Sequence, residues 1–434
     1  METVRKEILP GVWLTALRSD KFKTGCLSIN LLTQLDRETA SMNAVIPYVL
    51  RRGSRYHTDM ESIASALDGL YGSSIEPVVR KIGEIQCIGF VASFADDKYL
   101  PEGSNVFESV AGLCGEMLLT PNTKGGLLLP SYVESEKEKL LENIRSRIND
   151  KRSYALSRLI EQMCCYEPFS VARYGTEETA ESIYYQKLSK HYRSLLAESP
   201  VEIFYCGSLD AEKCADILTD ALSGMPRGEI NYDIGTDIRM NSVDDGVRVF
   251  EDRLAVTQGK LVMGYRLGDC MENPDFAAIY VFNAVYGGCV TSKLFMNVRE
   301  RLSLCYYASS GVDIHKGLMF ISSGVDFEKF DDAKAEIIAQ LEAVKNGDIS
   351  DEELNAAKKS VASDLRAMMD SQFNLDGFYL SNAIGGLEFD PMELAALVES
   401  VSRDDVVSVA RSLVPDAVYF LRGNDDEEVE SDEA

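Results

Sequence analysis

The same order of predicted elements occurs twice along this chain of 434 residues. In each half a buried strand and a helix precede a pair of strands, a run of helices and a closing strand. The closing strands are predicted at 201–207 and 416–422, where apolar residues follow one another with few interruptions. A tyrosine stands at the equivalent point of each half, Tyr71 and Tyr306. We therefore expect an α+β protein of two duplicated α/β sandwich domains, each a mainly antiparallel sheet with helices packed on it.

The predicted boundary between the halves is a polar segment rich in turn residues, 225–229. The sequence predicts an N-terminal domain at 1–222, a linker at 223–240 and a C-terminal domain at 241–422. A run of Asp and Glu dominates 423–434, and we expect this acidic tail to be disordered.

The net charge and the cysteines of the chain limit which classes of partner and which cellular compartment we expect. Forty-four Lys and Arg against 70 Asp and Glu give a formal net charge of −26, which disfavours nucleic acid and anionic membrane surfaces as partners. The N-terminus has no apolar signal segment, and no uncharged apolar stretch approaches the roughly 18 residues of a membrane span. Ten scattered cysteines without a C-x-x-C pair indicate free thiols in a reducing compartment. We expect a cytoplasmic protein with no membrane span.

Two stretches carry the strongest motif signals. The first, 41–54, is an apolar run that ends in two arginines, a glycine and a serine. The second, 294–306, reads Leu-Phe-Met-Asn-Val-Arg-Glu-Arg-Leu-Ser-Leu-Cys-Tyr. Further landmarks are Tyr-Gly-Thr at 174–176 and Phe-Tyr-Cys-Gly at 204–207.

Together these motifs resemble those of the pitrilysin/insulinase-type zinc metallopeptidases over nearly the whole chain. The stretch 294–306 is similar to the family pattern L-F-x-x-(L/V)-R-E-x-x-G-L-x-Y, with Ser303 in place of the glycine. Features at 21–24, 67–72 and 149–155 resemble an inactive group from Gram-positive bacteria that is usually paired with an active homologue. The resemblance implies a metallopeptidase-like half-clamshell with a part in proteolysis or peptide binding.

In active relatives the first stretch is the zinc helix, which carries H-x-x-E-H shortly before a Gly-Thr. When the chain is aligned on Gly53, the first His, the Glu and the second His are replaced by Ala44, Pro47 and Tyr48. Zinc requires imidazole, thiolate or carboxylate ligands, and its water requires a neighbouring general base. A methyl group, a pyrrolidine ring and a phenol supply neither, so we predict no metal site and no catalytic residue.

The third zinc ligand of active relatives is a Glu on a long charged helix, with a supporting Glu seven residues before it. The resemblance places Asn143 at the ligand position and retains Glu136 at the supporting position. The chain has three histidines, His57, His191 and His315, in separate segments. We expect surface or structural roles for them, because no two are spaced as a ligand pair.

Arg299 and Tyr306 match a pair that is retained in the family motif. In active relatives the equivalent residues come from the second domain, and the resemblance implies that they hold the substrate backbone and stabilise an oxyanion. The alternative is structural: Arg299 forms an ion pair within its own domain and Tyr306 fills a core.

These features predict a non-catalytic subunit that forms a heterodimer with an active, zinc-bearing homologue and contributes contacts to a peptide or unfolded protein. The mitochondrial processing peptidase, with one active and one inactive subunit, is the family precedent. No cofactor is expected in this chain, since zinc is expected only in the partner. Two alternatives stay open: a stand-alone peptide-binding scaffold that forms a homodimer, and an active metallopeptidase with a rearranged metal site.

Overall fold

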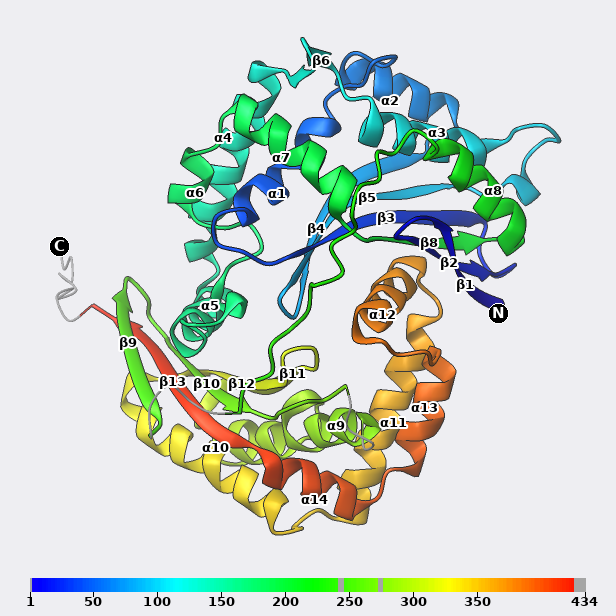
Figure 1. The fold of residues 1–434 in the computed structure, drawn as a ribbon. Helices are drawn as coiled ribbons and strands as arrows, with labels where there is room; N and C mark the ends of the chain where they lie inside the picture. Colours follow the sequence, from blue (N-terminus) through cyan, green and yellow to red (C-terminus); the bar gives the residue numbers. More distant parts are fainter. Residues whose placement is uncertain (1, 241–245, 272–275, 425–434) are drawn as a thin grey trace, which may run out of the picture. The chain divides into compact units, whose positions relative to one another are not determined.

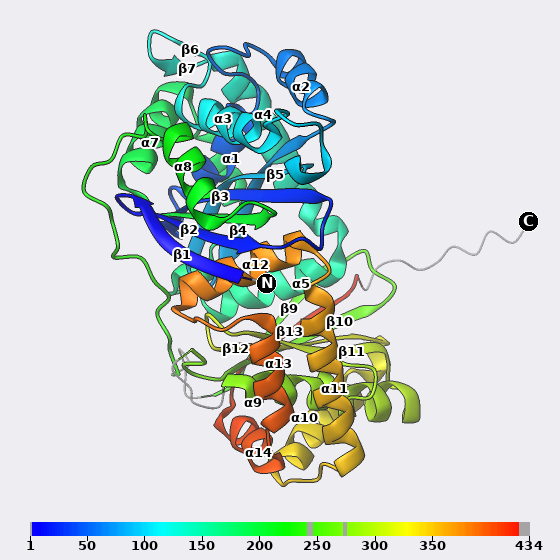
Figure 2. The same ribbon diagram turned by 90° about the vertical axis from the view of Figure 1, so that its right-hand side faces the viewer.

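The computed structural model describes residues 2–240, 246–271 and 276–424, which Figures 1 and 2 trace from blue to red. Contacts between Cα atoms divide the chain into two units. Unit 1 consists of the residues up to Ser146, Val171–Thr236 and Met368–Glu388. Unit 2 consists of Arg147–Ser170, Asp237–Ala367 and the residues from Phe389 onward. Each unit has the predicted α+β composition.

Unit 1 is built on a six-stranded sheet in the order β1-β2-β8-β3-β5-β4. β2 and β8 run parallel, and all other neighbours in this sheet run antiparallel. The central strand β3 is buried over most of its length, as expected of a strand with helices on both faces. The strands are β1 Glu2–Leu9, β2 Val12–Arg18, β3 Thr24–Gln34, β4 Ser74–Ile82, β5 Ile85–Ala95 and β8 Val201–Gly207, with a short hairpin of β6 Thr123–Lys124 and β7 Leu127–Leu128.

Helices pack on both faces of this sheet. Leu27 and Ile29 of β3 point to the main core, into which helices α1, α3 and α7 pack. Cys26 of the same strand points to the opposite face, where Leu375 of α12 packs against it. The helices of unit 1 are α1 Ala40–Leu50, α2 Met60–Gly69, α3 Val106–Leu119, α4 Pro130–Ser146, α6 Glu177–Glu181, α7 Tyr185–Glu198, α8 Ala211–Ala221 and α12 Gln372–Gly385, with the 3₁₀ turn η1 Asp97–Tyr99.

Unit 2 is built on a five-stranded sheet in the order β11-β12-β10-β13-β9. β13 and β9 run parallel and the remaining pairs antiparallel. Its strands are β9 Arg248–Leu254, β10 Gly259–Arg266, β11 Cys305–Asp313, β12 Leu318–Val325 and β13 Val414–Gly423. Its helices are α5 Lys151–Met163, α9 Phe276–Asn283, α10 Phe330–Lys345, α11 Asp351–Met368, α13 Pro391–Ser400 and α14 Arg403–Ser412, with the π-helical turns η4 Ala284–Gly288 and η5 Leu294–Arg301 and the 3₁₀ turns η2 Arg147–Asn149, η3 Pro168–Ser170 and η6 Phe327–Lys329.

The strand order confirms the predicted duplication. Apart from β1, the two sheets match strand for strand, with β4, β5, β3, β8 and β2 replaced by β11, β12, β10, β13 and β9. In both units a residue with positive φ separates a helix from the edge strand that follows, Tyr71 (φ 59°) before β4 and Ser303 (φ 50°) before β11. The equivalence of Tyr71 and Tyr306 stays a prediction from the sequence, since Gly72 (φ 71°) also has a positive φ before β4.

One helix from each half of the sequence belongs to the unit of the other half. α5 comes from the first half and packs on β10 and β13 of unit 2, whereas α12 comes from the second half and packs on β8 and β3 of unit 1. The units are consequently discontinuous, while the predicted domains at 1–222 and 241–422 are consecutive. Within the predicted linker, residues 223–236 group with unit 1. The predicted acidic tail lies outside the described residues from position 425 onward.

No helix in the described part of the chain combines the length and the apolar character that crossing a bilayer requires.

Candidate functional site

The helix at the family's zinc position is α1, which begins at Ala40 and continues through Pro47. Proline removes a backbone donor, but the helix ladder resumes one turn later, where the Arg51 N–H donates to the Pro47 carbonyl at 3.0 Å. Ala44 is fully buried in the core of unit 1. Ala44 and Pro47, which replace the first His and the Glu of the zinc motif, are thus buried aliphatic residues without a metal donor.

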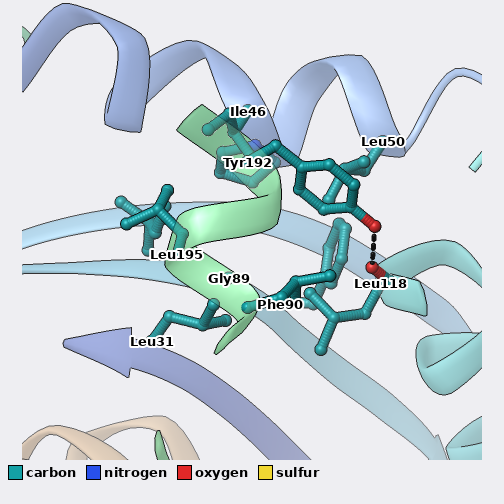
Figure 3. A pocket seen from close by; sticks show the side chains of 11 residues that line it. Leu31, Ile46, Leu50, Gly89, Phe90, Leu118, Tyr192 and Leu195 are labelled. Carbon is teal, nitrogen blue, oxygen red and sulfur yellow. Dashed lines mark hydrogen bonds between the residues drawn. The ribbon is translucent and has the colours of Figure 1, made fainter. Parts of the chain in front are cut away.

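The buried face of α1 lines a small apolar pocket (Figure 3). Ile46 and Leu50 of α1 lie on one side of it, opposite side chains from the sheet and from α7. Pro47 also lines this pocket. Tyr192 of α7 donates its hydroxyl to the carbonyl of Leu118 at 2.6 Å. The pocket has a volume of about 10 Å³, which is roughly the size of one water probe and too small for a ligand.

Tyr48, at the position of the second His, is half-buried. Burial raises the pKa of its phenol, and Tyr174, to which the hydroxyl is hydrogen bonded, raises the pKa further. The phenol therefore stays protonated at neutral pH and does not offer an anionic oxygen to a cation.

Glu136 on α4 is only 5% exposed, and its carboxylate is already paired with two cations. Arg52 donates to Oε1 at 2.8 Å and Lys139 donates to the same oxygen at 2.8 Å. The Arg52 guanidinium also lies 5.0 Å from the centre of the Tyr132 ring. Asn143, at the position of the third ligand, lies two turns along α4 and is exposed to solvent.

A buried polar network that the sequence did not reveal fixes the first turn of α1. The Asn43 side chain donates to Gln86 Oε1 at 2.8 Å and accepts a hydrogen bond from His191 Nε2 at 2.6 Å. Gln86 in turn donates to the carbonyls of Ala40 and Arg173 at 3.0 and 2.6 Å. Burial lowers the pKa of His191. The network is therefore neutral, and His191 is committed to Asn43 rather than to a metal.

Taken together, the residues at this position do not fit zinc. Ala44 and Pro47 lack donor atoms, Tyr48 is protonated, and Glu136 is held by two cations. Across the ranges that the structure describes, no three His, Cys, Asp or Glu side chains gather closely enough to hold a metal ion. These side chains therefore offer a catalytic zinc ion no set of ligands.

The other two histidines lie in separate parts of the chain. His57 Nδ1 is 3.0 Å from Glu116 Oε1 of α3, so this pair ties the loop after α1 to a neighbouring helix. His315 lies in the turn between β11 and β12, where burial lowers its pKa to about 4.

His315 gives an expected pH dependence of stability. Its imidazole must be neutral in the folded state and has a pKa near 6.5 in the unfolded chain, so stability is fully present above about pH 6.5 and is lost as the pH falls towards about 4. Allowing for its partial exposure, we expect a loss of about 1–2 kcal/mol over this range. Urea denaturation at several pH values should show this slope, and the His315→Gln variant should show a flatter one. An unchanged slope in the variant would assign the pH dependence to other groups.

Arg299 lies on η5 and Tyr306 at the start of edge strand β11, both in unit 2. Arg299 is on η5, its guanidinium lies 4.7 Å from the centre of the Phe295 ring, and it is 3.6 Å from a Glu300 oxygen. Tyr306 is 61% exposed, and its hydroxyl donates to Asp326 Oδ1 at 3.1 Å. This hydrogen bond raises the pKa of Tyr306. Neither side chain fills a core.

A groove lies alongside the same edge strand, between α5 and the β11–β12 hairpin. Its volume is about 460 Å³. We call it the α5 groove, and its walls and floor are formed by Arg152, Ser153, Leu156, Ile160, Phe169, residues 309–313, Phe320 and Ser322. No motif predicted this groove, because small residues in a strand carry no signal for a cavity.

Comparison with known proteins agrees with the geometry. The model of the Peptidase M16 inactive domain matches residues 182–361. The probable inactive metalloprotease YmfF of Bacillus subtilis (strain 168) is 30% identical over 417 residues, which is 96% of each chain. A crystal structure of a conserved protein from Enterococcus faecalis V583 aligns with a TM-score of 0.87 at 26% identity, over 97% of this chain and 99% of that one. A peptidase M16 inactive domain from Pseudomonas fluorescens aligns with a TM-score of 0.78 at 15% identity, over 98% and 99%.

The full-length relative has this chain's length and is itself described as inactive, and the residues at the zinc position lack the donors that catalysis requires. This chain belongs to the peptidase M16 family, as a non-catalytic homologue.

Proposed function

We propose that this chain is the non-catalytic subunit of a cytoplasmic peptide-processing pair. It binds an active, zinc-bearing homologue and holds extended segments of peptide or unfolded protein while the partner cleaves them. Zinc belongs to the partner alone, because the equivalent positions of this chain do not supply its ligands.

The proposal rests on the contrast between two groups of family positions. At the zinc position Ala44, Pro47 and Glu136 are buried, whereas the Tyr306 residue is 61% exposed and the Arg299 side chain 40% exposed; each of the latter two also has a partner within unit 2, Asp326 and Glu300 respectively. A guanidinium and a phenol are the groups expected to bind a peptide carbonyl or a developing oxyanion. Solvent exposure of Tyr306 favours this role over the structural alternative, in which the ring would be buried.

Strand β11 supports the same role. It is the edge strand of its sheet and pairs only with β12 among the strands of the described chain. An extended peptide gains main-chain hydrogen bonds by adding to such an edge. Tyr306 is the second residue of β11, and Arg299 lies on η5, six residues before the strand begins at Cys305, so both donors flank the start of this edge.

Arg299→Ala is expected to lower kcat/KM of the assembled pair about tenfold, because a charge-assisted hydrogen bond to the substrate is lost. The chain should be co-expressed with an M16 homologue that has an intact H-x-x-E-H motif, and the purified complex assayed on unfolded protein. Arg301→Ala, an exposed arginine on the same helix, is the matched control and should retain full activity.

Two outcomes would contradict the proposal. Elution of the chain as a homodimer in the presence of that homologue would favour the stand-alone scaffold. Equal activity of the Arg299→Ala and Arg301→Ala complexes would remove Arg299 from the substrate contacts, even if the pair forms.

A further inference from the structure

The face of the unit 2 sheet on which α5 packs is only partly covered. α5 sits on β10 and β13, where Gly264 makes room for it: a Cβ at this position would lie 2.5 Å from Met163 Sδ. Beside the helix, over β11 and β12, the sheet stays open and forms the α5 groove. In unit 1 the side chain of Arg80 on edge strand β4 reaches Asp376 of α12 and bridges the corresponding space. The opening is thus a property of unit 2.

Small side chains form the floor of the α5 groove. Ser309 of β11 pairs with Ser322 of β12, and Gly311, two residues further along β11, pairs with Phe320. A Cβ added to Gly311 would meet no atom within 4 Å. The volume of about 460 Å³ lies within the range of pockets that bind ligands of modest size.

The groove has an apolar part, serines along its floor, the Asp313 carboxylate at the end of β11 and a cation, Arg152, at the start of α5. Leu156, Ile160, Phe169 and Phe320 line its apolar part. At the start of α5, the Arg152 guanidinium lines the other end. Arg152 favours an anionic group at its end and the apolar part favours an apolar one, while the Asp313 carboxylate accepts from the Lys316 N–H at 2.9 Å.

Arg152 is held in place by two contacts. Its guanidinium carbon lies 4.4 Å from the centre of the Tyr307 ring, and Nη2 donates to Ser309 Oγ at 2.9 Å. The Tyr307 ring lies against Gly324, where a Cβ would come within 2.5 Å of the ring. Nearby Asp150 directs its carboxylate to the N-terminus of α5, accepting from the Arg152 and Ser153 N–H groups at 3.1 and 3.2 Å. The Asp150 carboxylate therefore caps the N-terminus of α5.

The spacing of the helix residues matches an extended peptide. Arg152, Leu156 and Ile160 follow at intervals of four residues, so they form one stripe with a rise of about 6 Å per step. Side chains on one face of a strand repeat every two residues, about 6.6 Å. α5 also lies alongside the hairpin, since Arg152 contacts Ser309 of β11, and Leu156 and Ile160 line the same groove as residues 309–313.

We propose that the α5 groove selects peptides that carry an acidic residue and, two positions away, a bulky apolar residue. The peptide adds to the edge of β11, its carboxylate meets Arg152, and its apolar side chain enters the space above Gly311 between Leu156 and Phe320. The proposal deepens the peptide-binding role given above and rests on it, because it names the class of segment that β11 receives.

The test uses the full chain alone and three fluorescein-labelled peptides of about ten residues, with Glu and Phe two positions apart, with Lys in place of the Glu, or with Ala in place of the Phe. Fluorescence anisotropy should give the Glu/Phe peptide about tenfold tighter binding than either of the others. Arg152→Glu should reverse the preference for Glu over Lys. Gly311→Val should remove the advantage of Phe over Ala while leaving the Ala peptide unchanged, which also reports an intact fold. Arg253→Glu on β9, the opposite edge of the sheet, is the charge-matched control and should change nothing.

Equal affinity for the three peptides, or binding of none, would overturn the groove assignment. So would a preference that survives both Arg152→Glu and Gly311→Val. None of these results bears on pairing with the active homologue, which the Arg299→Ala assay of the complex tests separately.

Discussion

Replacing Glu167 with leucine is expected to lower the free energy of unfolding of unit 2 by about 3–5 kcal/mol. Glu167 follows α5 and accepts from Arg266 of β10 at 2.7 Å and from Lys316 of the β11–β12 turn at 2.7 Å. The Arg266 and Lys316 side chains are almost completely buried. Burial would raise the pKa of Glu167, but the two cations outweigh it and hold the pKa below its usual range. Leucine at this position therefore leaves the buried Arg266 and Lys316 without the carboxylate that neutralises them.

The remaining partners of the two cations limit the loss. Arg266 also donates to Asp416 Oδ2 at 2.6 Å, and Lys316 also donates to the carbonyl of Asp237. These bonds keep Arg266 and Lys316 partly satisfied, so we expect local loosening of α5 before global unfolding. Hydrogen exchange measured by mass spectrometry should show faster exchange in residues 151–163, and urea denaturation followed by circular dichroism should show the lower stability.

Glu161→Leu is the matched control for Glu167→Leu. Glu161 lies on the same helix and pairs with Arg158 at 2.7 Å, but both side chains are partly exposed. Such a pair contributes about 1 kcal/mol or less. If the two variants lose similar stability, the buried network does not hold α5 on its sheet, and the packing of Leu159 and Met163 accounts for it instead.

Much of the fold could be predicted from the sequence because the duplicated pattern of strands is local. The closing strand predicted at 201–207 is confirmed at those bounds, and the one predicted at 416–422 lies within β13, Val414–Gly423. The exchange of α5 and α12 could not be predicted. The buried stripe of α5, formed by Ala155, Leu159 and Met163, shows that the helix has an apolar face, but the same pattern would suit either sheet.

The candidate site divides in the same way. The loss of metal donors could be read residue by residue, because ligand chemistry depends on residue type alone. The polar network that occupies the zinc position instead could not be predicted, because its hydrogen bond between Asn43 and His191 joins residues 148 positions apart. The α5 groove was likewise invisible, since it results from the absence of side chains at positions such as Gly311 and from a helix that arrives from the other half of the chain.

Asp376→Leu is expected to destabilise unit 1 by about 3 kcal/mol, for a reason that mirrors Glu167. Asp376 on α12 is fully buried, accepts from Ser28 of β3 and pairs with Arg80 of β4. Each helix from the other half of the chain thus brings, on or just after it, one buried carboxylate to an arginine of the sheet that receives it. Because Arg80 is partly exposed and regains some hydration, we expect a smaller effect than at Glu167.

The only tryptophan of the chain makes this loss measurable in unit 1. Trp13 lies on β2 of the same sheet, so its fluorescence follows the unfolding of unit 1, while circular dichroism follows both units. The Trp13 transition should move to lower urea in Asp376→Leu. The double variant Arg80→Leu/Asp376→Leu should recover part of the loss, because an apolar pair replaces a stranded buried charge. If the double variant is instead the sum of its two single variants, Arg80 and Asp376 contribute independently, and α12 is held on its sheet by apolar packing around Leu375.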